Sequence, residues 1–229
     1  PHSVAWITYQ GPYSMISIII RTYNNEQFIK QAVESALNQD FSNYEIIVIN
    51  DGSTDTTDEI LDSFNDPKLT VIHQSNHGML QAGYDGLEQA QGEYIIFLDG
   101  DDELAPSALT SLTAGIGDAV FAYSDYTEVN VGEGSQKYVS CSNIFNTLAA
   151  GILFHKGSLL KIGFWDTSMI FPEYDLLIRL MAEHKSVHIA EALYVYNRHP
   201  NSFTADTERV ERGKEELFAK YGEFKFKEY

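Results

Sequence analysis

The stretch "YIIFLDGDDE", Tyr94–Glu103, decides how the chain folds. Apolar and aromatic residues run without a break into three aspartates and a glutamate, as expected of a buried strand that ends in a cluster of negative charge. Carboxylates this close together repel one another. A metal ion, bound protons or open water must therefore neutralise them, and which of these does so bears directly on function.

Strands and helices alternate on the amino-terminal side of this stretch. Apolar, β-branched runs predict strands, and helical spacing of apolar residues predicts helices. The strands are expected at 16–22, 44–50, 69–73 and 93–98, and the helices at 26–39, 55–65 and 80–91. This alternation predicts an α/β fold whose mainly parallel sheet is built through right-handed crossovers.

The pattern becomes less regular after Pro106. We expect helices at 106–114, 174–184 and from about 207, a strand at 119–126, a polar stretch at 127–138, and a pair of strands around 186–197. Residues 1–14 are expected to be an N-terminal extension, either an expression remnant or a cut from a longer chain. Residues 15–229 are then one domain, with a nucleotide-binding half (15–104) and a lid or second-substrate half (105–229).

Three polar segments follow predicted strands directly. They are "TYNNE", "NDGSTD" and "DGDDE". In open α/β sheets, ligands bind beyond the carboxyl ends of the strands. The three segments are therefore expected to meet at one edge of the sheet and to form a binding site there.

The composition limits what that site binds. With 15 basic and 33 acidic residues, the net charge of −18 argues against nonspecific binding to nucleic acid or to an anionic membrane. Phosphates would need backbone N–H groups, a few local cations or a metal ion. The single Cys141 excludes an internal disulfide framework and fits a reducing compartment. No apolar run approaches the ~20 residues that span a bilayer.

Several familiar motifs are excluded. Loops that start at Asp51 or Asp99 lack the Gly at position six and the Glu at position twelve of an EF-hand. The chain has no GxxxxGK[ST] loop, and "GEGSQK" lacks the third glycine of the dinucleotide fingerprint. His184 and His188 stand four apart, but no Glu follows His184, so surface histidines are favoured over a zinc helix.

The two acidic clusters each allow two interpretations. "DGST" (51–54) is a turn with a helix cap, or part of the site at the sheet edge. "DGDD" (99–102) is a solvated turn, or a cation site in which Asp99 and Asp101 face one point. Such a site suits Mg²⁺ or Mn²⁺, because these hard cations prefer oxygen ligands and leave positions open for phosphates.

Longer segments resemble a known family. "SIIIRTYNNEQFIKQAVESALNQDFSNYEIIVINDGSTDTT", followed by "SNHGMLQAGYDGLEQAQGEYIIFLDGDDEL", is similar to family 2 glycosyltransferases. "FPEYDLLIRL" and "YNRHPNS" extend the resemblance over about residues 15–202. It implies the GT-A fold, a nucleotide-sugar donor, Mn²⁺ or Mg²⁺ as cofactor, and transfer with inversion at the anomeric carbon.

The resemblance also implies roles for individual residues. Glu173 stands in the position of the catalytic base, and Asp175, which matches the flanking pattern, is expected at the catalytic site with it. Asp101 would be the direct metal ligand, with Asp99 near the ribose or the metal's water shell, and His199 a further ligand or a structural residue. The residues expected at the nucleotide are Thr22, Tyr23, Asn24, Glu26, Asp51, Gly52, Ser53, Asp99, Arg198 and Ser202.

Three positions depart from the family pattern. Gly83 replaces an Arg that often lies near the donor, Pro172 replaces the first acid of an E-D pair, and Asn197 replaces an Arg. The base position keeps a carboxylate, because Glu173 follows Pro172 where the family usually has Asp. A simpler interpretation of Glu173 is a helix N-terminal acid favoured by the dipole.

The sequence thus predicts a metal-dependent inverting glycosyltransferase. The expected donor is a UDP-sugar, and the acceptor is a hydroxyl of a glycan or of a lipid-linked sugar. The expected location is the cytoplasm, with peripheral attachment to the inner membrane face as an option. The alternatives are a noncatalytic nucleotide-sugar or carbohydrate-binding module and a nucleotidyltransferase, whose basic Gly-rich loop is missing from "RTYNNEQ".

Overall fold

The computed structural model of the protein describes residues 14–141, 144 and 148–222, so the predicted N-terminal extension lies almost wholly outside the described residues. The first four strands form a parallel sheet in the order β3-β2-β1-β4. The strands are β1 (Ile16–Thr22), β2 (Tyr44–Asn50), β3 (Leu69–His73) and β4 (Tyr94–Asp99), and the helices between them are α1 (Ile29–Leu37), α2 (Thr57–Asp62) and α3 (Met79–Gln89). The predicted strand–helix alternation is confirmed.

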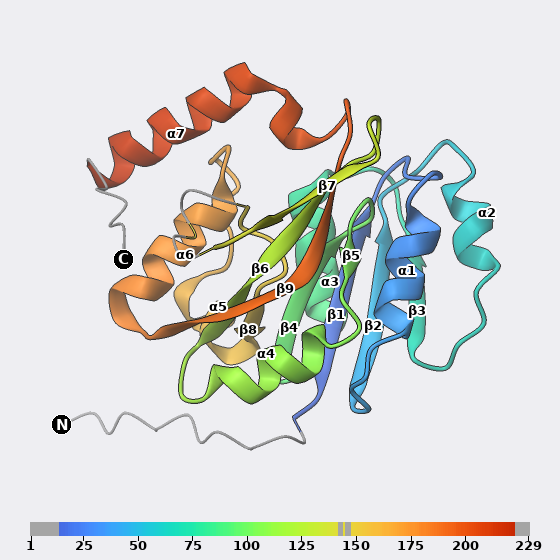
Figure 1. The fold of residues 1–229 in the computed structure, drawn as a ribbon, viewed down its shortest axis with the longest axis horizontal. Helices are drawn as coiled ribbons and strands as arrows, with labels where there is room; N and C mark the ends of the chain where they lie inside the picture. The colour runs from blue at the N-terminus through green and yellow to red at the C-terminus, as the bar shows by residue number, and fades with distance from the viewer. Residues whose placement is uncertain (1–13, 142–143, 145–147, 223–229) are drawn as a thin grey trace.

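The rest of the chain extends the same sheet. Beyond β4 the order is β8-β6-β9-β5, with β7 paired to β6, and parallel and antiparallel neighbours are mixed. The elements are β5 (Glu103–Leu104), α4 (Ala108–Ile116), β6 (Phe121–Asn130), β7 (Ser135–Val139), β8 (Leu153–His155), α5 (Lys156–Ile162), α6 (Pro172–Glu183), β9 (Ser186–Arg198), a 3-10 turn (Phe203–Ala205) and α7 (Thr207–Tyr221). Figure 1 shows α7 lying across the end of the molecule above α6.

One prediction for this half was wrong. The expected strand pair around 186–197 is one long strand, β9, whose pairing with β6 slips at Asp125. The slip inserts extra residues into β9, which breaks the alternation that marks a continuous strand. The polar stretch 127–138 contains the end of β6 and most of β7, which pair as an antiparallel hairpin. Most side chains of this stretch are exposed, which fits their polarity.

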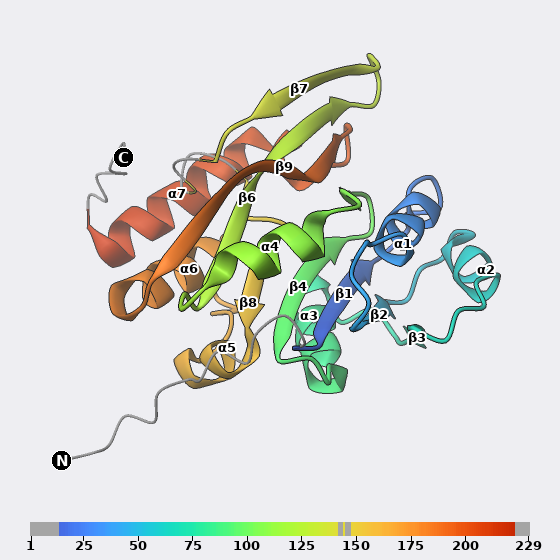
Figure 2. The same cartoon turned by 60° about the horizontal axis from the view of Figure 1, so that its bottom comes forward.

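Helices cover both faces of the sheet and create two cores. Helices α1 and α4 pack with residues such as Ile18 and Ile20 on one face, and α3, α5 and α6 pack with Ile19 and Ile49 on the other. Figure 2 shows these layers from a second side. Every residue of β1 is buried, as expected of a central strand covered on both faces.

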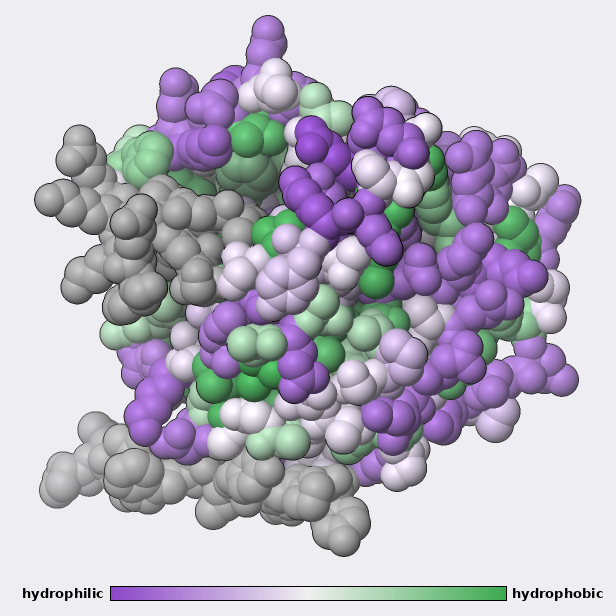
Figure 3. Space-filling view, viewed as in Figure 1, coloured by the Kyte–Doolittle hydropathy of each residue, from purple (hydrophilic) through white to green (hydrophobic). Residues whose placement is uncertain are grey.

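The surface is largely polar. Figure 3 shows hydrophilic side chains over much of one face, especially over α1 and α2, with smaller apolar areas between them. Within the part of the chain that the structure describes, no helix is both long and apolar enough to cross a membrane.

Candidate functional site

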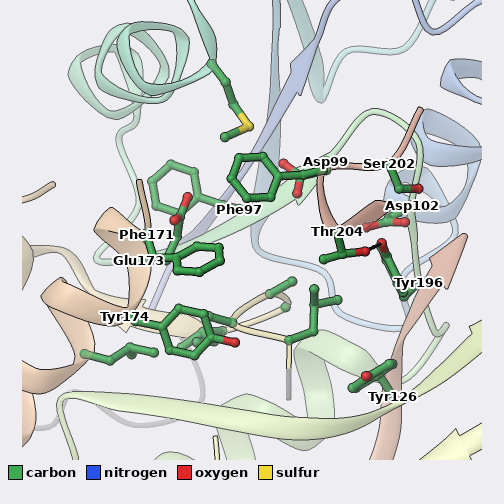
Figure 4. Close-up of a pocket in the computed structure, with 18 of the residues that line it drawn as sticks. Phe97, Asp99, Asp102, Tyr126, Phe171, Glu173, Tyr174, Tyr196, Ser202 and Thr204 are labelled. Carbon is green, nitrogen blue, oxygen red and sulfur yellow. Dashed lines mark hydrogen bonds between the residues drawn. The ribbon is translucent and has the colours of Figure 1, made fainter. Parts of the chain in front are cut away.

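A cavity of about 640 Å³ opens beyond the carboxyl end of β4, lined by residues of β1, β4, β6, α6 and α7. Figure 4 shows aromatic rings, among them Phe171 and Tyr174, around this space, with Asp99 and Glu173 reaching into it. Its polar and charged lining comprises Arg21, Asp99, Asp101, Asp102, Glu128, Glu173, Arg198, Ser202, Thr204 and Lys214. The cavity therefore combines an acidic floor with apolar walls.

Asp101 contacts a histidine from another part of the sheet. Its Oδ2 lies 3.0 Å from Nε2 of His199, and the imidazole stacks on Phe28 with the ring centroids 4.8 Å apart. Burial raises the pKa of Asp101, and the negative charge of Asp99 adds to this, although the hydrogen bond from His199 opposes it. A positive charge at this position would therefore be favourable.

Asp99 has a different partner, Arg21 on the neighbouring strand β1. The Arg21 side chain is 7% exposed and bonds Asp99 through Nη2, while its Nη1 lies 3.9 Å from Oε1 of Glu173. We did not single out Arg21 from the sequence. The available signal was a lone cation inside the isoleucine run "ISIIIRT".

Asp102 fastens the turn that carries these acids. It is 2% exposed and accepts hydrogen bonds from the Tyr194 hydroxyl at 2.7 Å and the Asn197 backbone N–H at 2.8 Å. Burial raises its pKa well above the usual value, and Asp101 and Asp99 raise it further. We call residues 99–102 the acidic turn. The side-chain amide of Asn197 also donates to the Asp101 carbonyl at 2.9 Å, so Asn197, which replaces the Arg of the family pattern, anchors this turn.

Glu173 enters the cavity from the first turn of α6. Pro172 begins that helix, a position where its missing N–H costs nothing. The carboxylate lines the cavity and is 25% exposed. Burial raises the pKa of Glu173 and the charge of Arg21 lowers it, with a net rise. A carboxylate with a raised pKa in a cavity is suited to accept a proton.

The segments after β1 and β2 interlock beside the cavity. The backbone N–H of Asn24 donates to Oγ of Ser53 at 2.9 Å, and the side chain of Asn24 accepts from the Thr54 backbone N–H at 2.7 Å. Glu26 accepts from the hydroxyl of Thr56 at 2.8 Å. We call residues 22–26 and 51–56 the lip, and its side chains stand at one sheet edge as predicted.

Asp51 lies buried within the lip. It is 3% exposed and accepts hydrogen bonds from the Gln74 side chain at 2.9 Å and from the backbone N–H groups of His77 and Gly78 at 2.9 and 2.7 Å. The carboxylate therefore holds the loop that follows β3. The hydrogen-bond donors of the Asp51 carboxylate in the structure are thus atoms of this loop.

The structure brings some of the predicted site residues together and separates others. The predicted residues that line the cavity are Asp99, Asp101, Glu173, Arg198 and Ser202. Those outside its lining are Thr22, Tyr23, Asn24, Glu26, Asp51, Gly52, Ser53, Asp175 and His199. The lip still adjoins the acidic turn, because a Cβ at Gly100 would lie 2.6 Å from Oγ1 of Thr22. The two groups are neighbouring parts of one sheet edge.

Asp175 points into the protein. Its side chain is fully buried and pairs with Arg179 Nε at 2.8 Å and with Lys220 Nζ at 2.7 Å. It also accepts a hydrogen bond from Tyr221. Burial alone would raise its pKa, but the hydrogen bonds from Lys220, Tyr221 and Arg179 hold it below the usual value. Asp175 thus joins α6 to the end of α7.

The residues present fit an open cation site rather than a closed one. Among the described residues, no three His, Cys, Asp or Glu side chains are grouped so that they could hold a metal ion. Asp101 and His199 offer one oxygen and one nitrogen ligand, while Asp99 is engaged by Arg21. A cation here would need further oxygens from a bound substrate, as Mg²⁺ and similar ions often take from phosphates.

Comparisons with known proteins identify the family of the chain. The glycosyl transferase family 2 model matches residues 17–171. The chain is 30% identical over 219 residues to an uncharacterized glycosyltransferase of Rickettsia typhi, which covers 86% of this chain and 68% of the relative. It is 41% identical over 101 residues to the uncharacterized glycosyltransferase EpsJ of Bacillus subtilis, which covers 43% of this chain and 29% of that protein.

The fold matches solved glycosyltransferase structures. The S. aureus TarS 1–349 complex with UDP-GlcNAc has a TM-score of 0.73 at 20% identity, covering 89% of this chain and 66% of that one. The mannosyltransferase PcManGT from Pyrobaculum calidifontis, in complex with GDP-Man and Mn²⁺, has a TM-score of 0.72 at 17% identity, covering 94% and 66%. The predicted GT-A fold is confirmed.

The chain belongs to glycosyl transferase family 2, a family of transferase enzymes. The match ends at residue 171, so the family model does not reach Glu173 or the C-terminal helices. The pairwise matches to the B. subtilis relatives EpsJ and EpsH cover only 29% and 30% of the length of those proteins. Donor, acceptor and metal are therefore treated below as proposals.

Replacing Asp175 tests its structural placement. Asp175→Ala leaves Arg179 and Lys220 without their shared carboxylate. We expect the free energy of unfolding to fall by about 1.5–3 kcal/mol, the range for losing hydrogen bonds to a charged group, because both cations are partly exposed and keep other acceptors. Urea unfolding measures this. Asp118→Ala, which removes an exposed pair with Lys185, is the matched control and should change stability much less, because solvent screens exposed ion pairs. Equal losses in both variants would contradict the placement.

Proposed function

We propose that the protein is a metal-dependent inverting glycosyltransferase that moves a sugar from a nucleotide diphosphate to an acceptor hydroxyl. One observation carries the proposal: Asp101, whose Oδ2 lies 3.0 Å from Nε2 of His199, lines the same cavity as the carboxylate of Glu173. An acid cluster that can bind a cation and a separate carboxylate that can take a proton are the parts that such a transfer needs.

The proposed donor is a UDP-sugar. TarS was solved with UDP-GlcNAc and PcManGT with GDP-Man, which supports a nucleotide-sugar donor of this general kind. We place the base and ribose along the lip, near Asn24 and Ser53. The diphosphate then lies at the acidic turn, where Arg198 and Ser202 reach the same space.

The proposed cofactor is Mn²⁺ or Mg²⁺, held by Asp101 and His199. The Mn²⁺ in the PcManGT complex supports a divalent ion of this type. When bound, such an ion neutralises charge that develops on the departing diphosphate. Asp99 is assigned to the ribose side and to Arg21, because its carboxylate already bonds the guanidinium.

Glu173 is the proposed general base. The acceptor oxygen forms a bond to the anomeric carbon while the bond from that carbon to the β-phosphate oxygen breaks. Glu173 takes the proton of the acceptor hydroxyl, and the electrons of the broken bond leave with the nucleotide diphosphate. Attack from the face opposite the leaving group inverts the anomeric centre. Asp175 fixes the helix that presents Glu173 and is therefore assigned a positioning role.

The proposed acceptor is a glycan or a lipid-linked sugar. Phe171 and Tyr174 line the cavity near Glu173, whereas the cavity-lining Tyr196 lies near Asp102. Aromatic faces suit the apolar surfaces of sugar rings as well as aliphatic chains. This part of the cavity is where the acceptor hydroxyl would approach Glu173.

Calorimetry of UDP binding tests the cation site. We expect UDP to bind wild-type protein more tightly with Mn²⁺ than without it, and Asp101→Ala to lose most of that gain, because the carboxylate supplies a metal ligand. The control Asp118→Ala should retain it, since Asp118 lies on the surface. Binding that ignores both Mn²⁺ and Asp101 would contradict the metal-dependent site. Binding without any sugar transfer would favour a noncatalytic module.

Glu173→Gln tests the base. We expect kcat for transfer to fall by about 10²–10⁴-fold, the range for loss of a general base, while UDP affinity is retained. Glu183→Gln, at the other end of α6, is the control. Because the base acts when deprotonated and its pKa is raised, wild-type activity should fall on acidification at a higher pH than an ordinary Glu would give. An unchanged kcat in Glu173→Gln would contradict this role.

A further inference from the structure

Arg21 is unusual for its place in the fold. It lies near the end of the central strand β1, whose residues are all buried, and its own side chain is 7% exposed. Placing a cation there is costly unless charged partners compensate. Asp99 and Glu173 provide the compensation, and they come from different parts of the chain: β4 in the first half and α6 in the second.

The hydrogen bonding of Arg21 is incomplete. Nη2 bonds Asp99, but Nε and Nη1 are buried and have no hydrogen-bond partner among the described residues. Nη1 lies 3.9 Å from Oε1 of Glu173, just beyond hydrogen-bonding distance. If Arg21 served only to pack the core, two buried N–H donors without acceptors would lower the stability of the fold. A short movement of the Glu173 side chain would instead give Nη1 a charged acceptor.

Two aromatic rings and a glycine form a slot for the guanidinium. Its central carbon lies 5.0 Å from the Trp165 ring centroid and 5.6 Å from that of Phe97, distances at which cation–π attraction acts. Trp165 reaches this position because Gly83 has no side chain: a Cβ there would lie 2.2 Å from Cζ3 of Trp165 and 3.4 Å from Cδ of Arg21. Gly83 is thus required for Trp165 to cover Arg21.

We propose that Arg21 is a positioning residue for the transfer reaction, which holds Asp99 at the donor side and Glu173 at the acceptor side at a fixed separation. This rests on the proposed function of Glu173. The rigid guanidinium fork can direct one N–H group to each carboxylate, which a lysine ammonium does with less geometric definition. Gly83 and Trp165 keep the guanidinium in place, so they contribute to the same positioning role.

The test combines Arg21→Ala, Arg21→Lys and Gly83→Ala. Arg21→Ala should lower kcat by about 100-fold, because small misplacements of a reacting group have effects of this size, while the calorimetric Kd for UDP stays within about threefold. Guanidinium ion added at millimolar concentration should restore part of the lost kcat. Arg21→Lys should lose less than Arg21→Ala. Gly83→Ala, which displaces Trp165, should lower kcat without removing any charged group.

The control is Arg212→Ala, an exposed arginine of α7, which should show normal kcat and no response to guanidinium. The inference is overturned if folded Arg21→Lys and Gly83→Ala keep wild-type kcat, or if the loss in Arg21→Ala is in UDP affinity instead of kcat. It is also overturned if guanidinium restores nothing in a folded Arg21→Ala protein.

A crystal structure of Arg21→Ala separates this inference from the proposed function. We expect the Glu173 carboxylate to leave its wild-type position, because the cation between it and Asp99 is gone. An unmoved Glu173 would overturn the positioning role even if the wild-type protein transferred sugar. Conversely, Glu173 could be displaced in Arg21→Ala while the wild-type protein transfers no sugar. That result would support the positioning role and reject the glycosyltransferase mechanism.

Discussion

Mutual repulsion among the carboxylates at the end of β4 is the constraint on which the rest of the site depends. The structure answers it with a different partner for each acid. Asp99 bonds Arg21, Asp101 bonds His199, and Asp102 accepts from Tyr194 and from backbone. Of these three acids, Asp101 is the one whose partner is an imidazole that can itself ligate a cation. In the acidic turn, Asp102 is therefore the anchor, Asp99 is the acid bound by arginine, and Asp101 is the candidate metal ligand.

The same division links the two halves of the sheet. Arg21 connects β1 to α6 through Glu173, and His199 follows β9, which pairs with β6 and β5. Arg21 precedes its partner Asp99 by 78 residues, and His199 follows its partner Asp101 by 98. The contact with His199 ties the cavity to correct folding of the second half. The buried pairs of Asp175 extend this dependence to α7.

Much of this arrangement was predictable because it depends on local patterns. The β-branched runs "ISIIIRT" and "YEIIVIN" gave strand bounds that match β1 and β2. The carboxyl ends of parallel strands must meet at one edge, so the sequence alone predicts that the lip lies beside Asp99 and Asp101. The resemblance then supplied Glu173, which lies outside the alternating half and carries no local signal beyond its place at a helix start.

What the sequence concealed depends on contacts between distant segments. The bulge at Asp125 hid the continuity of β9, because extra residues break the alternation. Nothing near Asp175 in sequence shows that Lys220 reaches it. Arg21 was overlooked because a single cation in an apolar strand acquires meaning only when Glu173, Trp165 and Gly83 are in place around it.

The most direct test of the account is a crystal structure of the protein with UDP and Mn²⁺, with the metal located by its anomalous scattering. We expect an anomalous peak within coordinating distance of the Asp101 carboxylate and of a UDP phosphate oxygen, with Asp99 still bound to Arg21. A peak elsewhere, or UDP bound at the acidic turn with no metal beside Asp101, would contradict it.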